Sequence, residues 1–311
     1  MKALLFPGQG SQSGGMCSDL YKKYKIVRDT FEKADETLKF KISKLILEGP
    51  EEELKLTQNT QPSILTVSYS IIKVLTEEFK LDLRKIKFYA GHSLGEYSAL
   101  LSANSINFED ALKLLFLRGK YMQEAVPVGT GQMLAVLNTP LSSLEKILKE
   151  TNLTECEIAN DNSDGQVILS GKLNKINELQ SVLKEKKIKN IILPVSAPFH
   201  CSLMRPAAEK MKIEIEKINF KKPDVDIISN VTAKTISDTN IIKELLETQI
   251  YTKVRWRETI NYMIKNGVTH FIEIGPGKVL SGLVRRIKKD AEISNLNNFE
   301  DILKFSNEFT K

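Results

Sequence analysis

The sequence predicts an α/β protein in which a largely parallel sheet is covered by helices and a smaller subdomain is inserted into the chain. Strand-like apolar runs alternate with helical segments in the first and last parts of the chain, as is typical of parallel sheets. Residues 91–95 read Gly-His-Ser-Leu-Gly between a strand-like run and a helix-like segment. Residues 126–195 follow the order βαββαβ. We therefore expect an α/β-hydrolase-like core with a parallel sheet and a nucleophile elbow, plus an inserted ferredoxin-like subdomain.

Length and composition fit a globular protein with two structural parts. The 311 residues are enough to bury a large core, and 41% hydrophobic with 27% charged residues argues against disordered and fibrous classes. We expect a large α/β catalytic domain over residues 1–125 and 196–311 and a small subdomain over residues 126–195. The sequence has no uninterrupted apolar run suited to a signal peptide or a membrane helix, so we expect a cytoplasmic protein.

The charge of the chain indicates which partners it favours, and its cysteines indicate whether disulfides or a zinc site are expected. The formal net charge of +6 favours an acidic partner or an anionic substrate, but the lysines are spread along the chain and form no aromatic-interleaved patch typical of nucleic-acid binding. Cys17, Cys156 and Cys201 lack a C-x-x-C pair, so neither a disulfide framework nor a zinc site is predicted. Cys201 is more simply a small core residue than a nucleophile. We expect a monomer that needs no metal or cofactor and binds neither nucleic acid nor membranes.

A strand over residues 2–6 should open the sheet, and residues 7–16 after it form a loop rich in glycine and amides. The loop lacks the Lys-Ser/Thr ending of a P-loop and the G-x-G-x-x-G spacing, which argues against a phosphate site. At the carboxyl end of a central strand, one of its backbone N–H groups could instead stabilise an oxyanion. Helices are expected over residues 20–38 and 63–79, the second preceded by Pro62 at a plausible first helical position.

The predicted elbow centres on Ser93. A strand over residues 86–90 leads into it and a helix over residues 96–101 follows, which is the context that the motif requires and that a chance occurrence would lack. So sharp a turn leaves no room for Cβ atoms and favours φ > 0, which explains the two flanking glycines. The helix start directs N–H groups and the positive end of its dipole at Ser93, and the Leu94 N–H is one oxyanion donor.

The helix expected over residues 108–125 is apolar nearly all round and should therefore be buried. Arg118 lies inside it. A buried guanidinium requires an anionic partner, so Arg118 meets either an internal carboxylate or the carboxylate of a ligand. From position alone, the internal salt bridge is the preferred interpretation.

The subdomain and the return to the large domain complete the order of elements. In the subdomain we expect strands over residues 132–137, 155–160, 166–170 and 191–195, and helices over residues 142–150 and 172–187. A Pro-containing loop over residues 195–206 then leads into a helix that ends at Glu216. Beyond it we expect strands over residues 226–229 and 271–274, and helices over residues 256–265 and from Val279 onward.

A serine nucleophile needs a general base, and histidine is the usual one. The sequence contains three. His92 adjoins Ser93 and should point to the opposite face of the strand, while His270 begins a predicted strand at the end away from the active edge. Elimination leaves His200, in the Pro-containing loop, as the base, with an ordinary hydrogen-bonded loop histidine as the alternative. No acid accompanies His200, so an amide or a backbone carbonyl could orient its imidazole.

Seven blocks of sequence occur together in one order. They are Pro-Gly-Gln-Gly-Ser-Gln at 7–12, Thr-Gln-Pro at 60–62, Gly-His-Ser-Leu-Gly-Glu-Tyr at 91–97, Arg-Gly at 118–119, Ala-Pro-Phe-His at 197–200, Gln249 with Trp256, and Gly-Pro-Gly at 275–277. Together they resemble the malonyl-CoA:acyl carrier protein transacylase family. The resemblance runs from the first strand to about Arg286, and the tail after it carries no recognisable feature.

The resemblance implies an acyltransferase of fatty acid biosynthesis. Such an enzyme moves the malonyl group from malonyl-CoA to the phosphopantetheine thiol of the acidic acyl carrier protein through a malonyl-serine intermediate. The resemblance implies Ser93 as the nucleophile and His200 as its base, with the N–H groups of Gln9 and Leu94 as the oxyanion hole. It also implies that Gln249 orients His200 through its carbonyl.

The same resemblance assigns substrate-binding side chains. Arg118 would bind the free carboxylate of the malonyl group as a bidentate pair, which reverses the preference for an internal salt bridge. Gln61 matches a residue that lines the same pocket. Asn160 and Asn162 are candidates for contacts with the substrate arm, although the intervening Asp161 departs from the family's amide-rich pattern.

Two other interpretations use the same residues. A serine acyl-hydrolase, an esterase or a thioesterase, would employ the same Ser93 and His200, and the elbow alone does not separate it from a transferase. A non-catalytic subunit could dock an acidic carrier protein through its basic surface. Arg118 and the inserted subdomain favour transfer of a dicarboxylic acyl group to a bulky acceptor, and the intact Ser-His pair argues against the docking subunit.

Overall fold

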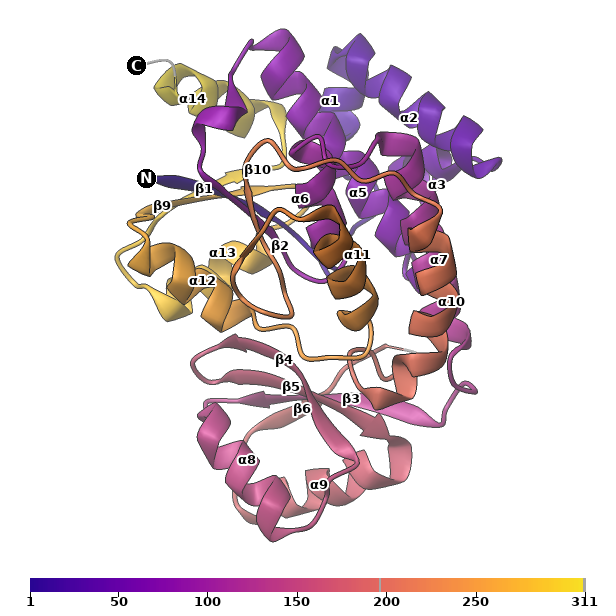
Figure 1. Ribbon diagram of the computed structural model, residues 1–311, viewed down its shortest axis with the longest axis vertical. Coiled ribbons are helices and arrows are strands. Elements are labelled where there is room, and N and C mark those ends of the chain that lie inside the picture. Colours follow the sequence, from indigo (N-terminus) through magenta and orange to yellow (C-terminus); the bar gives the residue numbers. More distant parts are fainter. Residues whose placement is uncertain (196, 310–311) are drawn as a thin grey trace.

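The computed structural model describes residues 1–195 and 197–309, which form a larger α/β part and a smaller part beside it (Figure 1). The larger part is built on a six-stranded sheet in the order β10-β9-β1-β2-β7-β8. Its strands are β1 (Lys2–Phe6), β2 (Phe88–Gly91), β7 (Asp226–Ile228), β8 (Thr235–Ile236), β9 (His270–Ile274) and β10 (Glu292–Leu296). All neighbours are parallel except β8, which runs antiparallel to β7 at one edge. The predicted α/β class is thus confirmed, with a mixed sheet that is mostly parallel.

Helices cover both faces of this sheet. They are α1 (Ser18–Lys23), α2 (Lys25–Leu38), α3 (Ile42–Glu48), α4 (Glu51–Leu54), α5 (Thr57–Lys73), α6 (Gly95–Ser102), α7 (Phe108–Glu124), α10 (Arg205–Glu216), α11 (Thr239–Thr248), α12 (Trp256–Lys265), α13 (Val279–Ile287) and α14 (Phe299–Phe309). Side chains alternate along a strand, so Leu4 and Phe6 of β1 join the core that includes α5 and α7, while Ala3 and Leu5 join the core that includes α12 and α13. Because β1 and β2 are parallel neighbours, their carboxyl ends lie side by side, where α/β proteins usually place their sites.

In the helical region before β2, the short helices α3 and α4 were not predicted, and the two predicted helices differ from the structure. The helix expected over residues 20–38 is two helices, α1 and α2, separated at Tyr24, whose backbone is extended. The helix expected from residue 63 already begins at Thr57, and Pro62 lies inside it. Proline removes one backbone hydrogen bond there, but 14 of the 17 residues of α5 are buried, and this packing outweighs the local preference. A π-helical turn, η1 (Val74–Glu78), ends the segment.

The smaller part has the predicted order βαββαβ. It consists of β3 (Gly131–Leu137), α8 (Leu141–Glu150), β4 (Cys156–Ser163), β5 (Gln166–Lys172), α9 (Leu173–Glu185) and β6 (Asn190–Ile192). The sheet order is β4-β5-β3-β6 with antiparallel pairing throughout. The two helices cover one face around a separate core that includes Leu134, Leu169 and Leu179. Strand β6 ends at Ile192, three residues before the predicted end.

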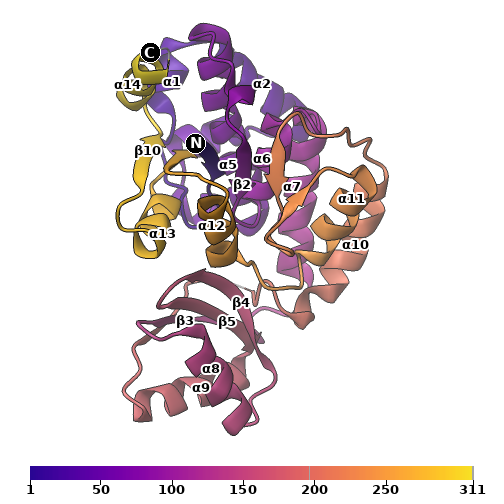
Figure 2. The same ribbon diagram turned by 60° about the vertical axis from the view of Figure 1, so that its left-hand side comes forward.

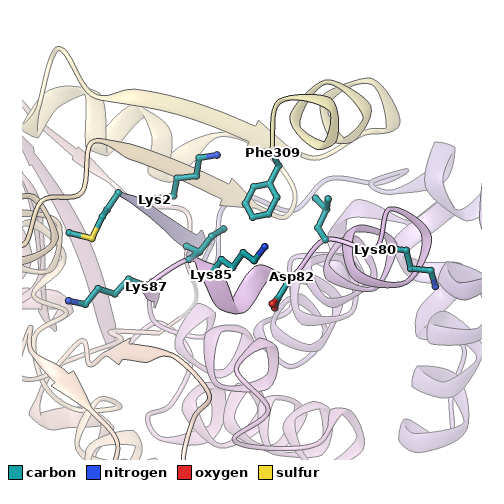
Figure 3. Close-up of a pocket in the computed structure, with 9 residues that line it drawn as sticks. Lys2, Lys80, Asp82, Lys85, Lys87 and Phe309 are labelled. Carbon is teal, nitrogen blue, oxygen red and sulfur yellow. The ribbon is translucent and has the colours of Figure 1, made fainter. Parts of the chain in front are cut away.

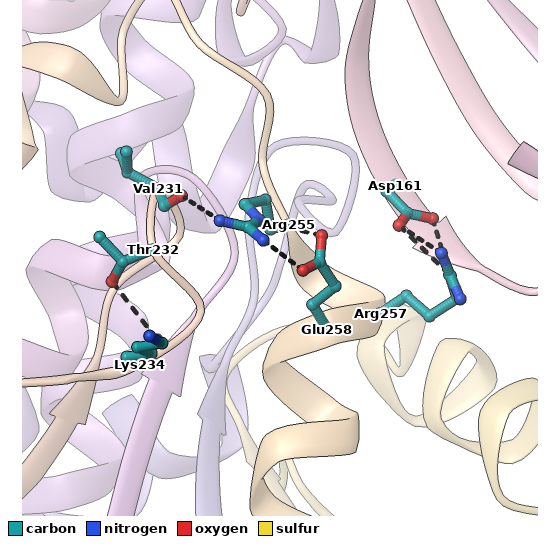
Figure 4. A network of polar contacts seen from close by, with 7 residues as sticks. All are labelled: Asp161, Val231, Thr232, Lys234, Arg255, Arg257 and Glu258. Atoms are coloured by element: carbon teal, nitrogen blue, oxygen red, sulfur yellow. Dashed lines mark hydrogen bonds and ion pairs between the residues drawn. The ribbon is translucent and has the colours of Figure 1, made fainter. Parts of the chain in front are cut away.

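Strand β4 joins the two parts, and Figure 2 shows it on the side of the smaller part that faces α12. The Asp161 carboxylate, fully buried, accepts hydrogen bonds from Arg257 Nε at 3.0 Å and Nη2 at 2.9 Å (Figure 4). Beside it, the Val254 N–H donates to Ala159 O at 2.8 Å and the Asp161 N–H donates to Val254 O at 3.0 Å. A bidentate ion pair and a short strand-like bridge therefore fix β4 against the large part.

The tail beyond residue 290 completes the large part. Strand β10 pairs in parallel with β9 at the edge of the sheet, and α14 buries Ile302 and Phe305 in the core. The Phe299 N–H at the start of α14 donates to Asp19 Oδ2 at 2.6 Å, which ties the tail to α1. Across the described residues, every helix is too short or too polar to cross a membrane.

Candidate active site

The turn between β2 and α6 presents Ser93 at the carboxyl edge of the sheet. Ser93 itself has a φ of 55°, so the left-handed conformation falls on the serine and not on the two glycines; of the two expected reasons for the glycines, positive φ is wrong and lack of room for a Cβ is confirmed. A Cβ on Gly91 would lie 1.9 Å from the Gly95 carbonyl, and one on Gly95 would lie 2.2 Å from Phe6 O. The glycines are therefore required by the close approach of the α6 start to the ends of β1 and β2.

Asn230, just after β7, holds this turn from both sides. The Ser93 N–H donates to Asn230 Oδ1 at 2.7 Å, and Asn230 Nδ2 donates to Gly91 O at 2.6 Å. Asn230 is 1% exposed, so these bonds replace solvent for the strained backbone. Asn230 was not predicted from the sequence. The sequence feature that could have indicated it is a polar residue directly after a predicted strand.

His200 contacts Ser93, the predicted nucleophile. Its Nε2 lies 2.8 Å from Ser93 Oγ, and its Nδ1 lies 2.8 Å from the backbone oxygen of Gln249. A carbonyl oxygen can only accept, so Nδ1 carries the hydrogen and Nε2 is left as the basic nitrogen that faces the hydroxyl. Burial, with a further contribution from the charge on Arg118, lowers the pKa of His200 to about 3. The imidazole is therefore neutral at physiological pH and able to take the Ser93 proton.

Arg118 also contacts the Ser93 hydroxyl, and its side chain is 1% exposed. Its Nη1 donates to Gln61 Oε1 at 2.8 Å, while its Nη2 donates to Gln249 Oε1 at 2.8 Å and to Ser93 Oγ at 3.1 Å. Within the described ranges no carboxylate forms an ion pair with Arg118, so the internal salt bridge preferred from position alone is not present; the charge of the buried Glu96 acts on the guanidinium only at longer range. A buried cation whose hydrogen bonds go to the oxygens of Gln61, Gln249 and Ser93 is suited to an anionic ligand.

Glu96 contacts two of the residues that hold Ser93 and Arg118, namely Asn230 and Gln249. Its buried Oε2 accepts from Gln249 Nε2 at 2.7 Å and from the Asn230 N–H at 3.1 Å. Burial raises the pKa of Glu96 to about 7, against the lowering effect of these two donors. No role was predicted for Glu96 from the sequence. It lies in the first turn of α6, three residues after Ser93.

The Ser93 side chain lines a cavity of about 120 Å³. The residues that line it are Gln9, Gln61, His92, Ser93, Leu94, Arg118, Met122, Met133, Asn160, Leu193, Val195, Phe199 and His200. Both predicted oxyanion donors belong to this set, and within the described part of the chain no acceptor is paired with the backbone N–H of Gln9 or of Leu94. Two free N–H groups beside an activated hydroxyl suit an oxyanion hole.

The two asparagines predicted for the substrate arm are placed differently. Asn160 lines the cavity, whereas the Asn162 Oδ1 lies 2.8 Å from His92 Nε2 and is occupied there. The His92 ring also packs edge-on against Trp256 with ring centroids 5.4 Å apart, and it is His200 that contacts the Ser93 hydroxyl. His270 is bonded to Ser294 at the start of β9, far along the strand from its carboxyl end.

Two other features do not offer comparable chemistry. Burial raises the pKa of the Cys201 thiol to about 11, and the thiol donates to Pro198 O at 3.1 Å, so Cys201 remains protonated. A cavity of about 560 Å³ lies at the amino end of the sheet and is lined by several lysines (Figure 3). In Figure 3 the Lys80 and Lys87 side chains extend outward in opposite directions, and among the described residues neither a serine nor a histidine lines this cavity.

The sequence is similar to a known family and to curated proteins. It matches the family described as "Acyl transferase domain" over residues 3–298. It is 46% identical to the Malonyl CoA-acyl carrier protein transacylase of Bacillus subtilis (strain 168) over 292 residues, which cover 92% of this chain and 90% of that protein. Similarity at this level extends over nearly the whole of both chains.

Solved structures give the same result for the fold. The crystal structure of acyl-carrier-protein-S-malonyltransferase from Bartonella henselae superposes with a TM-score of 0.96 at 42% identity, covering 100% of this chain and 99% of that chain. A structure of a type II PKS acyl-carrier protein in complex with its malonyl-transacylase contains a chain that superposes with a TM-score of 0.94 at 38% identity, covering 99% of each.

Proposed function

The chain belongs to the acyl transferase family, and we propose that Ser93 is the nucleophile with which it transfers malonyl groups from malonyl-CoA to acyl carrier protein. The activity is that of the full-length relatives, and malonyl-CoA and acyl carrier protein are its partners. The observation that carries the residue assignment is the position of Arg118, whose Nη2 lies 3.1 Å from Ser93 Oγ. This cation would select an acyl group that ends in a carboxylate.

In the first half-reaction, Ser93 Oγ attacks the thioester carbon of malonyl-CoA while His200 Nε2 takes the hydroxyl proton. The carbonyl oxygen becomes an oxyanion held by the N–H groups of Gln9 and Leu94, each worth about 3 kcal/mol in comparable sites. Collapse of the intermediate breaks the carbon–sulfur bond. The leaving thiolate of CoA takes the proton from His200, and the malonyl group remains as an ester on Ser93.

The second half-reaction reverses these roles with a new thiol. His200 removes the proton of the phosphopantetheine thiol of acyl carrier protein, and the sulfur attacks the ester carbon of malonyl-Ser93. The same N–H groups hold the oxyanion. When the carbon–oxygen bond breaks, Ser93 recovers its proton from His200. The carbonyl of Gln249 keeps the imidazole in the required tautomer through both steps.

Selectivity for the malonyl group would come from Arg118. Its two Nη atoms are held by Gln61 and Gln249, and a malonyl carboxylate would form a bidentate pair with the guanidinium. An acetyl group leaves the buried cation without an anion, which a site built for a charged partner penalises strongly. Asn160, on the cavity wall, is placed for a contact with the substrate arm. Asn162 would act only through His92.

We also propose the finer organisation of the chain. Residues 1–125 and 196–311 would form a catalytic domain of the α/β-hydrolase-like class, because its nucleophile sits on a strand-turn-helix elbow. Residues 126–195 would form a ferredoxin-like subdomain, which its order βαββαβ supports. The boundary at Ser196 lies outside the described residues. A monomer in the cytoplasm, supplying malonyl groups for fatty acid biosynthesis, is the setting that we propose.

One experiment tests the residue assignment and separates it from the hydrolase alternative. The protein is mixed with malonyl-CoA and its intact mass is followed with time. We expect a malonyl adduct that is stable in buffer, is absent in Ser93→Ala and is discharged by acyl carrier protein. Rapid loss of the adduct to water would indicate a serine acyl-hydrolase, and an adduct that persists in Ser93→Ala would exclude Ser93 as the nucleophile.

A further inference from the structure

Glu96 is a buried carboxylate that none of the steps above uses. It stands in the first turn of α6, three residues after Ser93, and is fully buried. A carboxylate in such a place is destabilising unless hydrogen bonds satisfy it. Two donors reach its Oε2: the Asn230 N–H at 3.1 Å and the Gln249 Nε2 at 2.7 Å. The second donor links it to the substrate-binding side of the site.

These contacts fix the direction in which the Gln249 amide is turned. Its Nε2 donates to Glu96 and, at 3.0 Å, to the backbone oxygen of Ser93, which uses both amide hydrogens. The amide oxygen therefore faces the other way and accepts from Arg118 Nη2 at 2.8 Å. The reversed amide would set its oxygen against a carboxylate and a carbonyl, and its hydrogens against the guanidinium, and none of these pairs forms a hydrogen bond.

We propose that Glu96 is a positioning residue for acyl selectivity: it holds the Gln249 amide, which in turn holds the Arg118 guanidinium where the acyl carboxylate binds. This inference rests on the proposed role of Arg118. His200 is held by a different atom, the backbone oxygen of Gln249 at 2.8 Å. Loss of Glu96 should therefore disturb Arg118 much more than the Ser93–His200 pair.

The test compares three reagents on Glu96→Ala. Loading of Ser93 by malonyl-CoA and by acetyl-CoA is followed by intact mass, and a fluorophosphonate reports on Ser93 and His200 alone. We expect malonyl loading to fall about ten- to a hundred-fold, the range for a lost hydrogen bond to a charged group. Acetyl loading and phosphonylation should change by only about three-fold, since the His200 contact is retained. Glu96→Gln, which keeps an acceptor oxygen, should restore most of the malonyl preference.

Glu273 provides the matched control. It is also a fully buried carboxylate, and it accepts from the Leu280 and Ser281 N–H groups at the start of α13 at 3.0 and 2.8 Å. Glu273→Ala should lower the melting temperature and leave the ratio of malonyl to acetyl loading unchanged. An unchanged ratio in Glu96→Ala, or equal losses with all three reagents, would overturn the positioning role.

A failure of the proposed function would be recognised separately. It would appear as a wild-type protein that gains no malonyl adduct at all. In that event the positioning role is read from the side-chain ¹⁵N resonance of the Gln249 amide. This resonance should shift in Glu96→Ala and stay in place in Glu273→Ala, and the absence of a shift in Glu96→Ala would overturn the inference.

Discussion

Ser93 and His200 meet at 2.8 Å, and both hold their backbone in the left-handed region, with φ of 55° and 59°. A residue with a side chain is strained there, by about 1–3 kcal/mol. Glycine would relieve the strain but would remove the hydroxyl or the imidazole. The strain persists because neighbours hold the two turns: Asn230 bonds the first on both sides, and the Gln249 carbonyl holds the imidazole of the second. The contact between Ser93 and His200 therefore depends on groups outside this pair.

Replacement of Arg118 should change selectivity more than catalysis. In Arg118→Ala the malonyl carboxylate loses its buried partner, and we expect malonyl transfer to fall by about 3 kcal/mol in transition-state stabilisation, roughly a hundred-fold. Acetyl transfer should fall much less, because an acetyl group makes no such pair. Steady-state kcat/KM for both CoA esters provides the measurement.

Arg118→Lys is the informative companion to that variant. A lysine keeps the charge but lacks the forked geometry that reaches Gln61 and Gln249 together. We expect malonyl transfer between that of Arg118→Ala and that of the wild type. Equal losses for malonyl and acetyl groups in Arg118→Ala would rule out the selectivity role.

The rate of acyl loading should be insensitive to pH in the range where a free histidine titrates. The pKa of His200 is lowered to about 3, first by burial and then by the charge on Arg118. The base works only when neutral, so it should be lost only as the pH falls through about 3, and not near the ordinary value of about 6.5. We expect acetyl-CoA loading, followed by quenched-flow mass measurement, to be nearly flat from pH 5 to pH 8. An acid limb with its midpoint near 6.5 would contradict this.

The same pKa shift affects stability with a defined sign. Because the folded pKa of His200 lies below the unfolded one, the unfolded state binds more protons between about 3 and 6.5. The stability that a neutral His200 allows is therefore present above this window and decreases as the pH falls through it.

Glu96 acts on stability in the opposite direction. Burial raises the pKa of Glu96 from 4.5 to about 7, so between these values the folded state keeps a proton that the unfolded state releases. Stability should consequently decrease as the pH rises through this window. Glu96→Gln abolishes the titration, so its stability relative to the wild type should improve between pH 5 and pH 8, by at most about 3 kcal/mol. The melting temperatures of the wild type and of Glu96→Gln are measured from pH 5 to pH 8. A difference between the two melting temperatures that stays constant with pH would contradict a raised pKa of Glu96.

The elbow and most of the strands could be predicted because their signals are local, whereas β8 and β10 were not predicted. The helix predicted over residues 256–265 coincides with α12, and the strand predicted over residues 226–229 differs from β7 by one residue. The start of α5 is predicted too late because proline favours the first turn of a helix, whereas here Pro62 is tolerated in a buried interior. The tail gave no signal because β10 and α14 are fixed by their contacts with β9 and the core and carry no sequence motif.

In the candidate site, too, some residues could be predicted from the sequence and others could not. Ser93 follows from glycine spacing and His200 from elimination, and the structure places them in contact. Asn230 was not predicted, because its sequence signal, a polar residue directly after a predicted strand, does not reveal that this strand pairs with the elbow strand and so faces a turn 137 residues earlier. Glu96 was not predicted because an acidic residue in the first turn of a helix is common on protein surfaces, where it interacts favourably with the helix dipole. Its presence there therefore does not indicate a functional site. Its hydrogen bonds to Asn230 and Gln249 exist only after the chain has folded.

Gly119 should be the glycine on which both stability and selectivity depend. It follows Arg118 in α7, where the helix passes closely over the start of α5, and a Cβ there would lie 2.5 Å from Gln58 Cα and 2.5 Å from Thr57 O. Backbone cannot yield as a flexible side chain would, so Gly119→Ala should force α5 away from α7. We expect a loss of about 1–3 kcal/mol in the free energy of unfolding, the usual range for overpacking.

The displacement should also reach the substrate site, because the obstructed helix carries Gln61, which holds Arg118. Gly282→Ala is the matched control: this glycine is also inside a helix, α13, but a Cβ there meets nothing within 4 Å. It should raise the free energy of unfolding by up to about 1 kcal/mol, through helix propensity alone. Urea unfolding and the ratio of malonyl to acetyl transfer are measured for both variants. If Gly119→Ala proved as stable and as selective as Gly282→Ala, the close packing of α5 on α7 would not be what requires the glycine.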